Sequence, residues 1–155
     1  MVRIIIYLIF ILFSCLSANA NKIQDCFYEC CFGSSYDEIM GKLVLQDYEV
    51  EKHASYLAVE GVFFGGVYFD KVLFRFKKNV FYCIEFYSDD NSDTQELHRK
   101  IVNKYNCFNI KDISASACDD LGRSVFSCFV SIDRYEYMLS YKDERLYDLC
   151  NSNDI

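Results

Sequence analysis

The sequence predicts an α+β fold in which an antiparallel sheet of about 4–6 strands carries helices on one face and contains disulfides. Three observations lead to this prediction. Apolar residues alternate with a period of two over residues 62–87 and again over 126–141, as half-buried strands require. Helical periodicity occurs near residue 36 and between the two alternating stretches. Finally, most of the nine cysteines lie C-terminal to a segment that resembles an export signal.

Residues 1–20 predict a signal peptide. Arg3 precedes an uninterrupted apolar run over residues 4–13, which is followed by Ala18-Asn19-Ala20. An apolar run of about ten residues is shorter than the roughly twenty that cross a bilayer as a helix. We therefore expect cleavage after Ala20, a periplasmic or secreted location, and a single mature domain, residues 21–155, without a membrane span. The alternative is a lipoprotein that is acylated at Cys15.

The mature cysteines indicate structural sulfur chemistry. Without Cys15, eight of the nine remain, and an even number in an exported chain suggests a disulfide framework whose pairing the spacing does not choose. Cys30 and Cys31 are adjacent, so we expect them to take separate partners. Several could stay reduced, because buried cysteine also packs as a small apolar residue. The candidates are Cys26, Cys30, Cys31, Cys83, Cys107, Cys118, Cys128 and Cys150.

Charge and composition exclude several classes of protein. Cleavage of the signal peptide removes Arg3 and leaves 15 basic and 23 acidic residues. The mature chain therefore has a formal charge of 15 − 23 = −8, and we do not expect it to bind nucleic acid or anionic lipid. Hydrophobic residues make up 52% of the sequence, which argues against disorder and for one compact domain.

The first element after the cysteine cluster is a helix over residues 36–44. Ser34 or Ser35 can cap it, and Asp37 and Glu38 place negative charge in its first turn, as the helix dipole favours. Its buried stripe would consist of Ile39, Met40, Leu43 and Val44.

Strands follow. Residues 56–59 and 62–69 predict a strand or hairpin bent at Gly65-Gly66, and residues 72–76 and 80–86 predict a hairpin. A three-residue loop with Asn79 in the left-handed conformation would place Lys71 opposite Glu85. The covered face of this hairpin would carry Val72, Phe74, Phe76, Val80, Tyr82 and Ile84.

A second helix and hairpin complete the fold. Ser92 and Gln95 form a capping box, and Asn106 is a plausible terminator for that helix. A hairpin then turns at Asp133-Arg134, and a helical turn covers residues 144–149. We expect Phe126, Cys128, Val130 and Ile132 to share the covered face with Tyr135, Tyr137, Leu139 and Tyr141, whereas Ser127, Phe129 and Ser131 face the other way with Met138.

Short motifs also occur in a recognisable order. They are Phe32-Gly33-Ser34 with Glu38, then Val72-x-Phe74-x-Phe76-x-x-Asn79, then Lys104-Tyr105-Asn106, and last Leu139-Ser140-Tyr141-Lys142-Asp143. On these motifs, residues 32–147 resemble a broad group of small, largely uncharacterised bacterial exported domains, with Asn106 in place of the usual glycine. The layout is also similar to that of outer-membrane assembly lipoproteins and β-lactamase-inhibitor proteins, which act by protein contact. The resemblance implies binding rather than catalysis.

Few residues suggest chemistry. His53 and His98 are the only histidines, and His98 is flanked by Glu96, Arg99 and Lys100, so we expect it to be solvated. The Asp89-x-Asn91-x-Asp93 spacing begins like a calcium loop but lacks the later glycine and bidentate glutamate. Cys26, Cys30 and Cys31 lack the paired spacing of a zinc site. We expect no metal, no cofactor and no catalytic residue.

The second face of the predicted sheet is unusually apolar. It would carry Leu73, Phe81, Cys83, Tyr87, Phe129 and Met138, although a solvated sheet face should be mostly polar. In one interpretation, residues 26–32 fold over this face and are tethered to Cys83. In the other, Leu73, Phe81, Tyr87, Phe129 and Met138 form a protein-binding or self-association surface.

The sequence therefore predicts an exported, non-catalytic module with a protein-binding or structural role, and the expected partner is another protein. The alternative is a secreted, hydrolase-like enzyme that uses His98 or His53 with a cysteine or a carboxylate.

Overall fold

The computed structural model describes residues 22–89, 92–132 and 134–152. The predicted signal peptide, with Arg3 and Cys15, lies outside these residues. Within the described ranges, no helix has both the length and the apolar character to cross a membrane.

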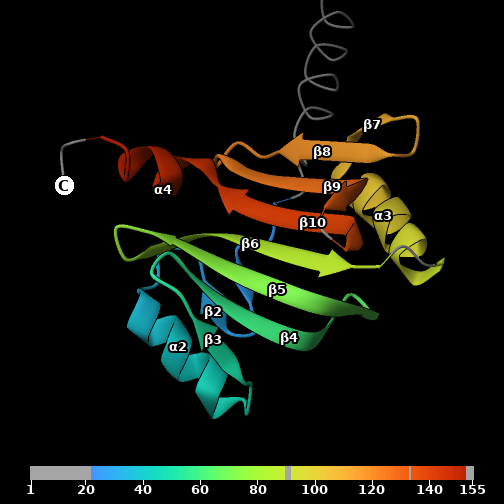
Figure 1. Cartoon of the computed structure of the whole chain (residues 1–155). Helices are drawn as coiled ribbons and strands as arrows, with labels where there is room; N and C mark the ends of the chain where they lie inside the picture. Colours follow the sequence, from blue (N-terminus) through green and yellow to red (C-terminus); the bar gives the residue numbers. More distant parts are fainter. Residues whose placement is uncertain (1–21, 90–91, 133, 153–155) are drawn as a thin grey trace, which may run out of the picture.

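The dominant element is an antiparallel sheet of eight strands in the order β3-β4-β5-β6-β10-β9-β8-β7. Figure 1 shows it running from teal β3 at the bottom to orange β8 and β7 at the top. The sheet is larger than the predicted 4–6 strands because β3, β7 and β8 are short and carry little apolar alternation. The strands are β3 (Val50–Lys52), β4 (Tyr56–Phe64), β5 (Val67–Lys77), β6 (Val80–Ser88), β7 (Phe108–Ile110), β8 (Ser114–Cys118), β9 (Arg123–Ile132) and β10 (Tyr135–Asp143).

Three described helices complete the α+β fold: α2 (Tyr36–Leu45), α3 (Ser92–Tyr105) and α4 (Glu144–Leu149). Ser35 caps α2 by accepting from the Glu38 amide, and Asn106 ends α3 in the left-handed conformation, with φ +50°. Both α2 and α3 bury apolar residues in the same core, so they cover one face of the sheet, as predicted. The predicted stripe of α2 is narrower than expected, because Val44 is half exposed.

The core is centred on the N-terminal hairpin of β1 (Cys26–Phe27) and β2 (Cys30–Cys31). Phe27 is 2% exposed. Its ring centroid lies 4.9 Å from that of Tyr141 and 6.1 Å from that of Phe86, both on the central strands β10 and β6. Phe32, just beyond β2, contacts Phe81 at 5.1 Å. The hairpin therefore covers the same face as the helices.

This placement corrects one interpretation of the sequence. Residues 26–32 do not fold over the second face and are not tethered to Cys83. A disulfide joins Cys26 to Cys31 within the hairpin itself, and Cys30 is free. The other described cysteines, Cys83, Cys107, Cys118, Cys128 and Cys150, are free as well. The prediction of a disulfide is thus confirmed for a single bridge, and Cys30 and Cys31 do not share a bond.

The hairpin turns differ from the predicted ones by small shifts. β4 and β5 are joined at Gly65-Gly66, where both residues have positive φ, so the predicted bend is a two-residue turn. β5 and β6 are joined by Lys78-Asn79, also with positive φ, which makes this loop one residue shorter than expected. In the resulting register Lys71 pairs with Tyr87, and Glu85 instead forms a 2.7 Å ion pair with Arg75.

Two β-bulges reverse the faces that simple alternation assigns. One lies after Arg75, where the register between β5 and β6 changes by one residue. As a result the Phe81 side chain points into the core on the covered face and is 0% exposed. The other lies between Tyr135 and Tyr137. Because a shift of one residue exchanges the two faces, Phe129 pairs with Tyr137 on the covered side, and Cys128 pairs with Met138 on the other side.

A buried ion pair holds the N-terminal segment to the sheet. The side chains of Asp119 and Arg123 are 4% and 3% exposed and lie 2.9 Å apart. Asp119 also accepts a 3.0 Å hydrogen bond from the Ile23 amide, 96 residues away in sequence. Although burial opposes ionisation, hydrogen bonds from Arg123 and from the Ile23 amide lower the pKa of Asp119.

We expect Phe27→Ala to destabilise the protein by about 3–5 kcal/mol, because it leaves a cavity at the centre of the aromatic core. The matched control is Phe63→Ala, which removes a ring that is 67% exposed and should change stability by less than about 0.5 kcal/mol. Urea unfolding measures both. Equal effects of the two substitutions would contradict the placement of the hairpin.

Thiol labelling tests the sulfur assignments. In the mature chain, Cys118 should react first because it is the exposed free cysteine among the described residues. Burial raises the pKa of the Cys30 thiol to about 11 and also raises that of Cys83 and Cys128, so these should react only after unfolding. Intact mass after denaturation without reductant should show six labelled thiols. Fewer labels would mean that further disulfides form.

Candidate functional site

The five residues predicted to form a binding surface are divided between the two faces of the sheet. Leu73, Tyr87 and Met138 lie on the face that α2, α3 and the N-terminal hairpin leave uncovered, which we call the open face. Phe81 and Phe129 lie on the covered face instead, because the two β-bulges shift the register by one residue and so exchange the faces. A single surface made of all five residues therefore does not exist.

The open face consists of rows of side chains that cross the strands. The row of Leu73 contains Ala58, Glu85, Ser140, Phe126 and Ser116, whereas the row of Tyr87 contains Glu60, Lys71, Met138, Cys128 and Ser114. A third row contains Tyr56, Arg75, Cys83, Lys142, Ser124 and Cys118. Tyr87, Phe126 and Met138 are half-buried. The face thus combines aromatic and apolar side chains with serines, as interface cores do.

The open face is also weakly charged. Its three rows, with Glu51 of β3 extending the row of Leu73 beyond Ala58, hold the three carboxylates Glu51, Glu60 and Glu85 and the three cations Lys71, Arg75 and Lys142, which sum to 3 − 3 = 0. The whole chain carries −7. The acidic surplus of the protein therefore lies elsewhere.

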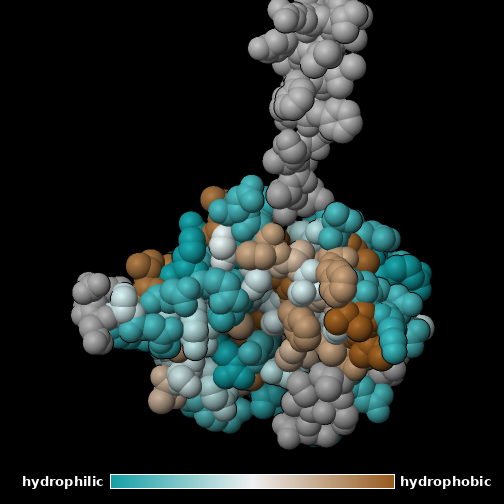
Figure 2. Space-filling model, turned by 90° about the horizontal axis from the view of Figure 1, so that it is seen from above, coloured by the Kyte–Doolittle hydropathy of each residue, from teal (hydrophilic) through white to brown (hydrophobic). Residues whose placement is uncertain are grey.

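The apolar character extends onto the edge strand β7, which the sequence did not reveal. Phe108 and Ile110 pair with Ser116 and Ser114, continue two of the open-face rows, and are 73% and 52% exposed. Ile113, in the turn after β7, is 51% exposed. In Figure 2 apolar residues gather on the right-hand side, where Figure 1 places β7 and α3. The three-residue length of β7 explains why no alternation marked it.

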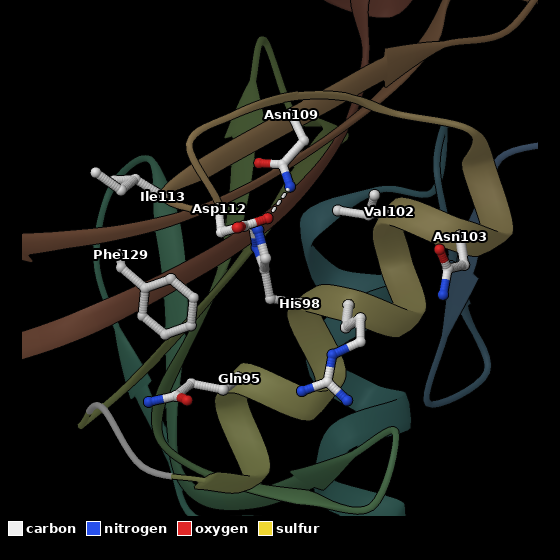
Figure 3. A pocket seen from close by; sticks show the side chains of 9 residues that line it. Gln95, His98, Val102, Asn103, Asn109, Asp112, Ile113 and Phe129 are labelled. Atoms are coloured by element: carbon white, nitrogen blue, oxygen red, sulfur yellow. Dashed lines mark hydrogen bonds between the residues drawn. The ribbon is translucent and has the colours of Figure 1, made fainter.

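On the covered side of the sheet, a pocket of about 610 Å³ opens between α3, the turn after β7, and β9. Figure 3 shows the His98 ring projecting from α3 toward Asn109 and Asp112, with Phe129 on the opposite wall. The remaining lining residues are Gln95, Arg99, Val102, Asn103 and Ile113.

His98 belongs to a chain of buried hydrogen bonds. Its Nδ1 lies 2.8 Å from the Oγ of Ser127, which in turn lies 2.6 Å from the hydroxyl of Tyr137. His98 is 4% exposed, and Ser127 and Tyr137 are 0% exposed. The expectation that His98 would be solvated was therefore wrong. The helix turns it inward beside Leu97, and the sheet supplies the polar partner that a buried imidazole needs.

The hydrogen-bond chain also assigns the imidazole proton. Burial raises the pKa of Tyr137 to about 12, so the phenol is neutral. With the phenol donating to Ser127, and Ser127 donating to Nδ1, every proton in the chain has an acceptor. This assignment from the network places the remaining imidazole proton on the buried Nε2.

Two polar atoms at the floor of the pocket lack a full partner. The Nδ2 of Asn109 donates a 2.7 Å hydrogen bond to Asp112. Oδ1 of Asn109 and Nε2 of His98 are buried, and neither makes a hydrogen bond of normal geometry to another described residue. Burial lowers the pKa of His98, while the charge of Asp112 and the nearby Asn109 amide oppose this shift.

The pocket offers little for covalent catalysis. None of the nine lining residues in the described chain carries a hydroxyl or a thiol, and Ser127 is sealed behind the imidazole. The other histidine, His53, lies on the surface, stacked on Tyr56 at 4.1 Å and 2.8 Å from Glu51. In the described part of the chain, neither histidine forms a hydrogen bond with a free cysteine.

Comparison of the chain with protein families, with characterised proteins and with solved structures gave no match.

Stability should depend on the protonation of His98. Because the pKa is lowered in the fold from about 6.5 in the unfolded chain, the neutral ring favours folding above this value, and the benefit is lost as the pH falls below it. The free energy of unfolding should therefore decrease between about pH 7 and about pH 5.5, and His98→Gln should reduce this decrease. Urea titrations at both pH values measure it.

The control for this measurement is His53→Gln, which removes the exposed histidine and should leave the decrease in place. If His98→Gln retains the full wild-type decrease, the buried neutral imidazole is not its cause.

Proposed function

We propose that the protein is an exported, non-catalytic binding module whose binding surface is the open face of the sheet, and that a second copy of the chain occupies this face. The observation that carries the proposal is the composition of the face. Tyr87, Phe126 and Met138 lie half-buried among serines on a sheet surface that α2 and α3 leave uncovered. Export is supported by the Arg3, apolar-run and Ala18-Asn19-Ala20 pattern.

Charge favours a second copy over other occupants. Two mature chains of −8 each repel one another over most of their surfaces, and this repulsion is weakest where each presents a face whose three rows carry no net charge. Arg75 and Glu85 already satisfy each other on the face, so a partner need not neutralise either. Two such faces would pack as an aligned sheet sandwich.

The size of the face is sufficient for such an interface. The five long strands β4, β5, β6, β10 and β9 lie at spacings of about 4.8 Å and together span roughly 19 Å, and nine residues along each strand span about 30 Å. The resulting area of roughly 570 Å², to which the short strands β3, β7 and β8 add, approaches the approximately 800 Å² per partner that specific interfaces bury. The exposed rings of β7 enlarge it at one edge.

The geometry supports this function better than the hydrolase alternative. His98 uses one ring nitrogen to bind Ser127, and the described pocket around the other nitrogen contains no hydroxyl or thiol that it could activate.

Sedimentation of the purified mature protein tests the proposal. We expect a dimer at micromolar concentrations, and we expect Tyr87→Ser with Met138→Ser to weaken it by at least about tenfold, because central aromatic and Met side chains dominate such interfaces. These side chains lie outside the core cluster, so the double variant should fold.

The matched control is Val44→Ser with Leu45→Ser on α2. It removes two apolar side chains that are 50% and 85% exposed on the helical side of the molecule, and it should leave the dimer unchanged. A wild-type protein that stays monomeric, or a dimer that survives the Tyr87 and Met138 substitutions, would refute the proposed occupant of the open face.

A further inference from the structure

We infer that the edge strand β7 pairs antiparallel with β7 of a second copy of the chain, centred on Asn109, so that two sheets join edge to edge. This contact is distinct from the one proposed for the open face. Among the described strands, β8 is the only neighbour of β7 in the sheet, so no strand lies along its other edge. Figure 1 shows β7 and β8 at the top of the sheet, which is the side that Figure 2 views.

The hydrogen bonds at the two ends of β8 show how this strand alternates between its neighbours. The Ile113 carbonyl accepts a 2.8 Å bond from the Phe129 amide, and the Asp119 amide donates a 2.9 Å bond to the Arg123 carbonyl. Both bonds join an odd-numbered residue of the β8 segment to β9. Because the bonding direction alternates from residue to residue, the even-numbered residues of β8 bond β7 instead.

This alternation identifies the backbone groups of β7 that point outward. Phe108 and Ile110 pair with the even-numbered Ser116 and Ser114, so both residues use their backbone groups to bond β8. Asn109 lies between them and therefore directs its N–H and C=O away from β8, toward the free edge. Outward backbone groups on an edge strand are a template for pairing with another strand.

A second β7 complements this edge in its side chains as well. In an antiparallel pair centred on Asn109, the two Asn109 residues exchange two backbone hydrogen bonds, and Phe108 of each copy lies opposite Ile110 of the other. The latter pairs are non-hydrogen-bonded ones, in which side chains approach most closely, and aromatic–aliphatic pairs across strands are stabilising. Phe108 and Ile110 are 73% and 52% exposed in the single chain, so the pairing would cover apolar surface.

Charge also permits this contact between two acidic chains. Residues 106–118 hold one cation, Lys111, and one anion, Asp112, whereas the whole chain carries −7. Pairing about Asn109 sets Lys111 opposite Cys107 of the second copy. It sets Asp112 opposite Asn106, so no like charges face each other across the strands. The two chains therefore approach where neither presents a net charge.

The other edge of the sheet does not offer such a pairing. β3 exposes Glu51 and Lys52, and charged side chains commonly protect sheet edges from association. A symmetric pair centred on Glu51 would set two carboxylates against each other. Only β7, with its apolar-polar-apolar pattern, is self-complementary among the two edge strands.

The edge contact is small and compatible with contact through the open face. The two-fold axis of an antiparallel strand pair runs perpendicular to the sheet, so the open faces of both copies stay on one side. Because β7 has three residues, the contact buries less area than a specific interface of standard size. We therefore expect a dissociation constant of about 0.1–1 mM for the edge contact alone.

Hydrogen exchange of the Asn109 backbone amide tests the pairing directly. The variant with Tyr87→Ser and Met138→Ser serves as the background, so that the open face does not contribute to self-association. Between roughly 20 μM and roughly 1 mM protein, exchange of this amide should slow by at least about twofold, because its N–H becomes bonded in the dimer. Sedimentation equilibrium over the same range should show the dimer.

Two matched pairs of variants in this background locate the contact. Ile110→Lys should weaken the dimer by at least about tenfold, whereas Ile113→Lys should not, because it adds the same charge outside the paired strand to a side chain of nearly equal exposure, 51% against 52%. Asn109→Pro removes the outward N–H at an edge position that tolerates proline, and it should abolish the dimer. Asn109→Ala keeps the N–H and should retain it.

An Asn109 amide that exchanges equally fast at both concentrations would overturn the inference. Dimers that Ile110→Lys and Ile113→Lys weaken to the same extent, or that Asn109→Pro leaves intact, would overturn it too. The amide reports on β7 alone, so the presence or absence of a wild-type dimer through the open face tests only the function proposed above.

Discussion

The insertion of Phe27 against Phe86 and Tyr141 decides which face of the sheet is covered. A large antiparallel sheet needs apolar cover on at least one side, and α2 and α3 alone lie toward its two ends. The N-terminal hairpin fills the centre between them, closed by the Cys26–Cys31 disulfide and anchored through Ile23 to Asp119. Because α2, α3 and the N-terminal hairpin all lie on this side, the other side is left open apart from its end at Lys77 and Lys142, where Tyr147 of α4 contacts both ammonium groups.

This division places two different surfaces on one small domain. The open face is broad, nearly uncharged and rich in half-buried aromatic and serine side chains, which suits contact with another protein surface. The pocket beneath α3 has a volume of about 610 Å³, and His98 in its lining is held by a chain of buried hydrogen bonds that begins at Tyr137. The sheet between them links the two, because Tyr137 and Met138 are neighbours on β10 that point to opposite faces.

Alternation and capping rules predicted most of the fold. The α+β class, the three described helices, the Ser35 cap, the Asn106 terminator and both main hairpins follow from local patterns. Local patterns did not predict the faces on which Phe81 and Phe129 lie. Each face depends on a bulge that inserts one residue, and the spacing of apolar residues does not reveal a bulge. The strands β7 and β8 were missed because they are short, and β8 consists of Ser, Ala and Cys.

The candidate sites were less predictable than the fold. Leu73, Tyr87 and Met138 were placed on the correct face because the bulges do not change their alternation, although Leu73 is only 8% exposed there. His98 was misjudged because its sequence neighbours are charged, whereas its burial depends on Ser127, which is 29 residues away. No sequence pattern marked Asn109 as a pocket residue, since it lines the pocket only because β7 places it opposite α3. Contacts of this kind are set by topology rather than by local sequence.

Hydroxyl-radical footprinting tests the central claim, that one face of the sheet is covered and the other is open, most directly. In dilute solution, Met138 and Tyr87 should be oxidised readily, whereas Phe27, Phe81 and Tyr137 should be protected because each is at most 2% exposed. At high concentration, Met138 and Tyr87 should become protected while the buried residues do not change. Oxidation of Phe81 in the folded protein, or protection of Met138 and Tyr87 in the dilute monomer, would contradict this account.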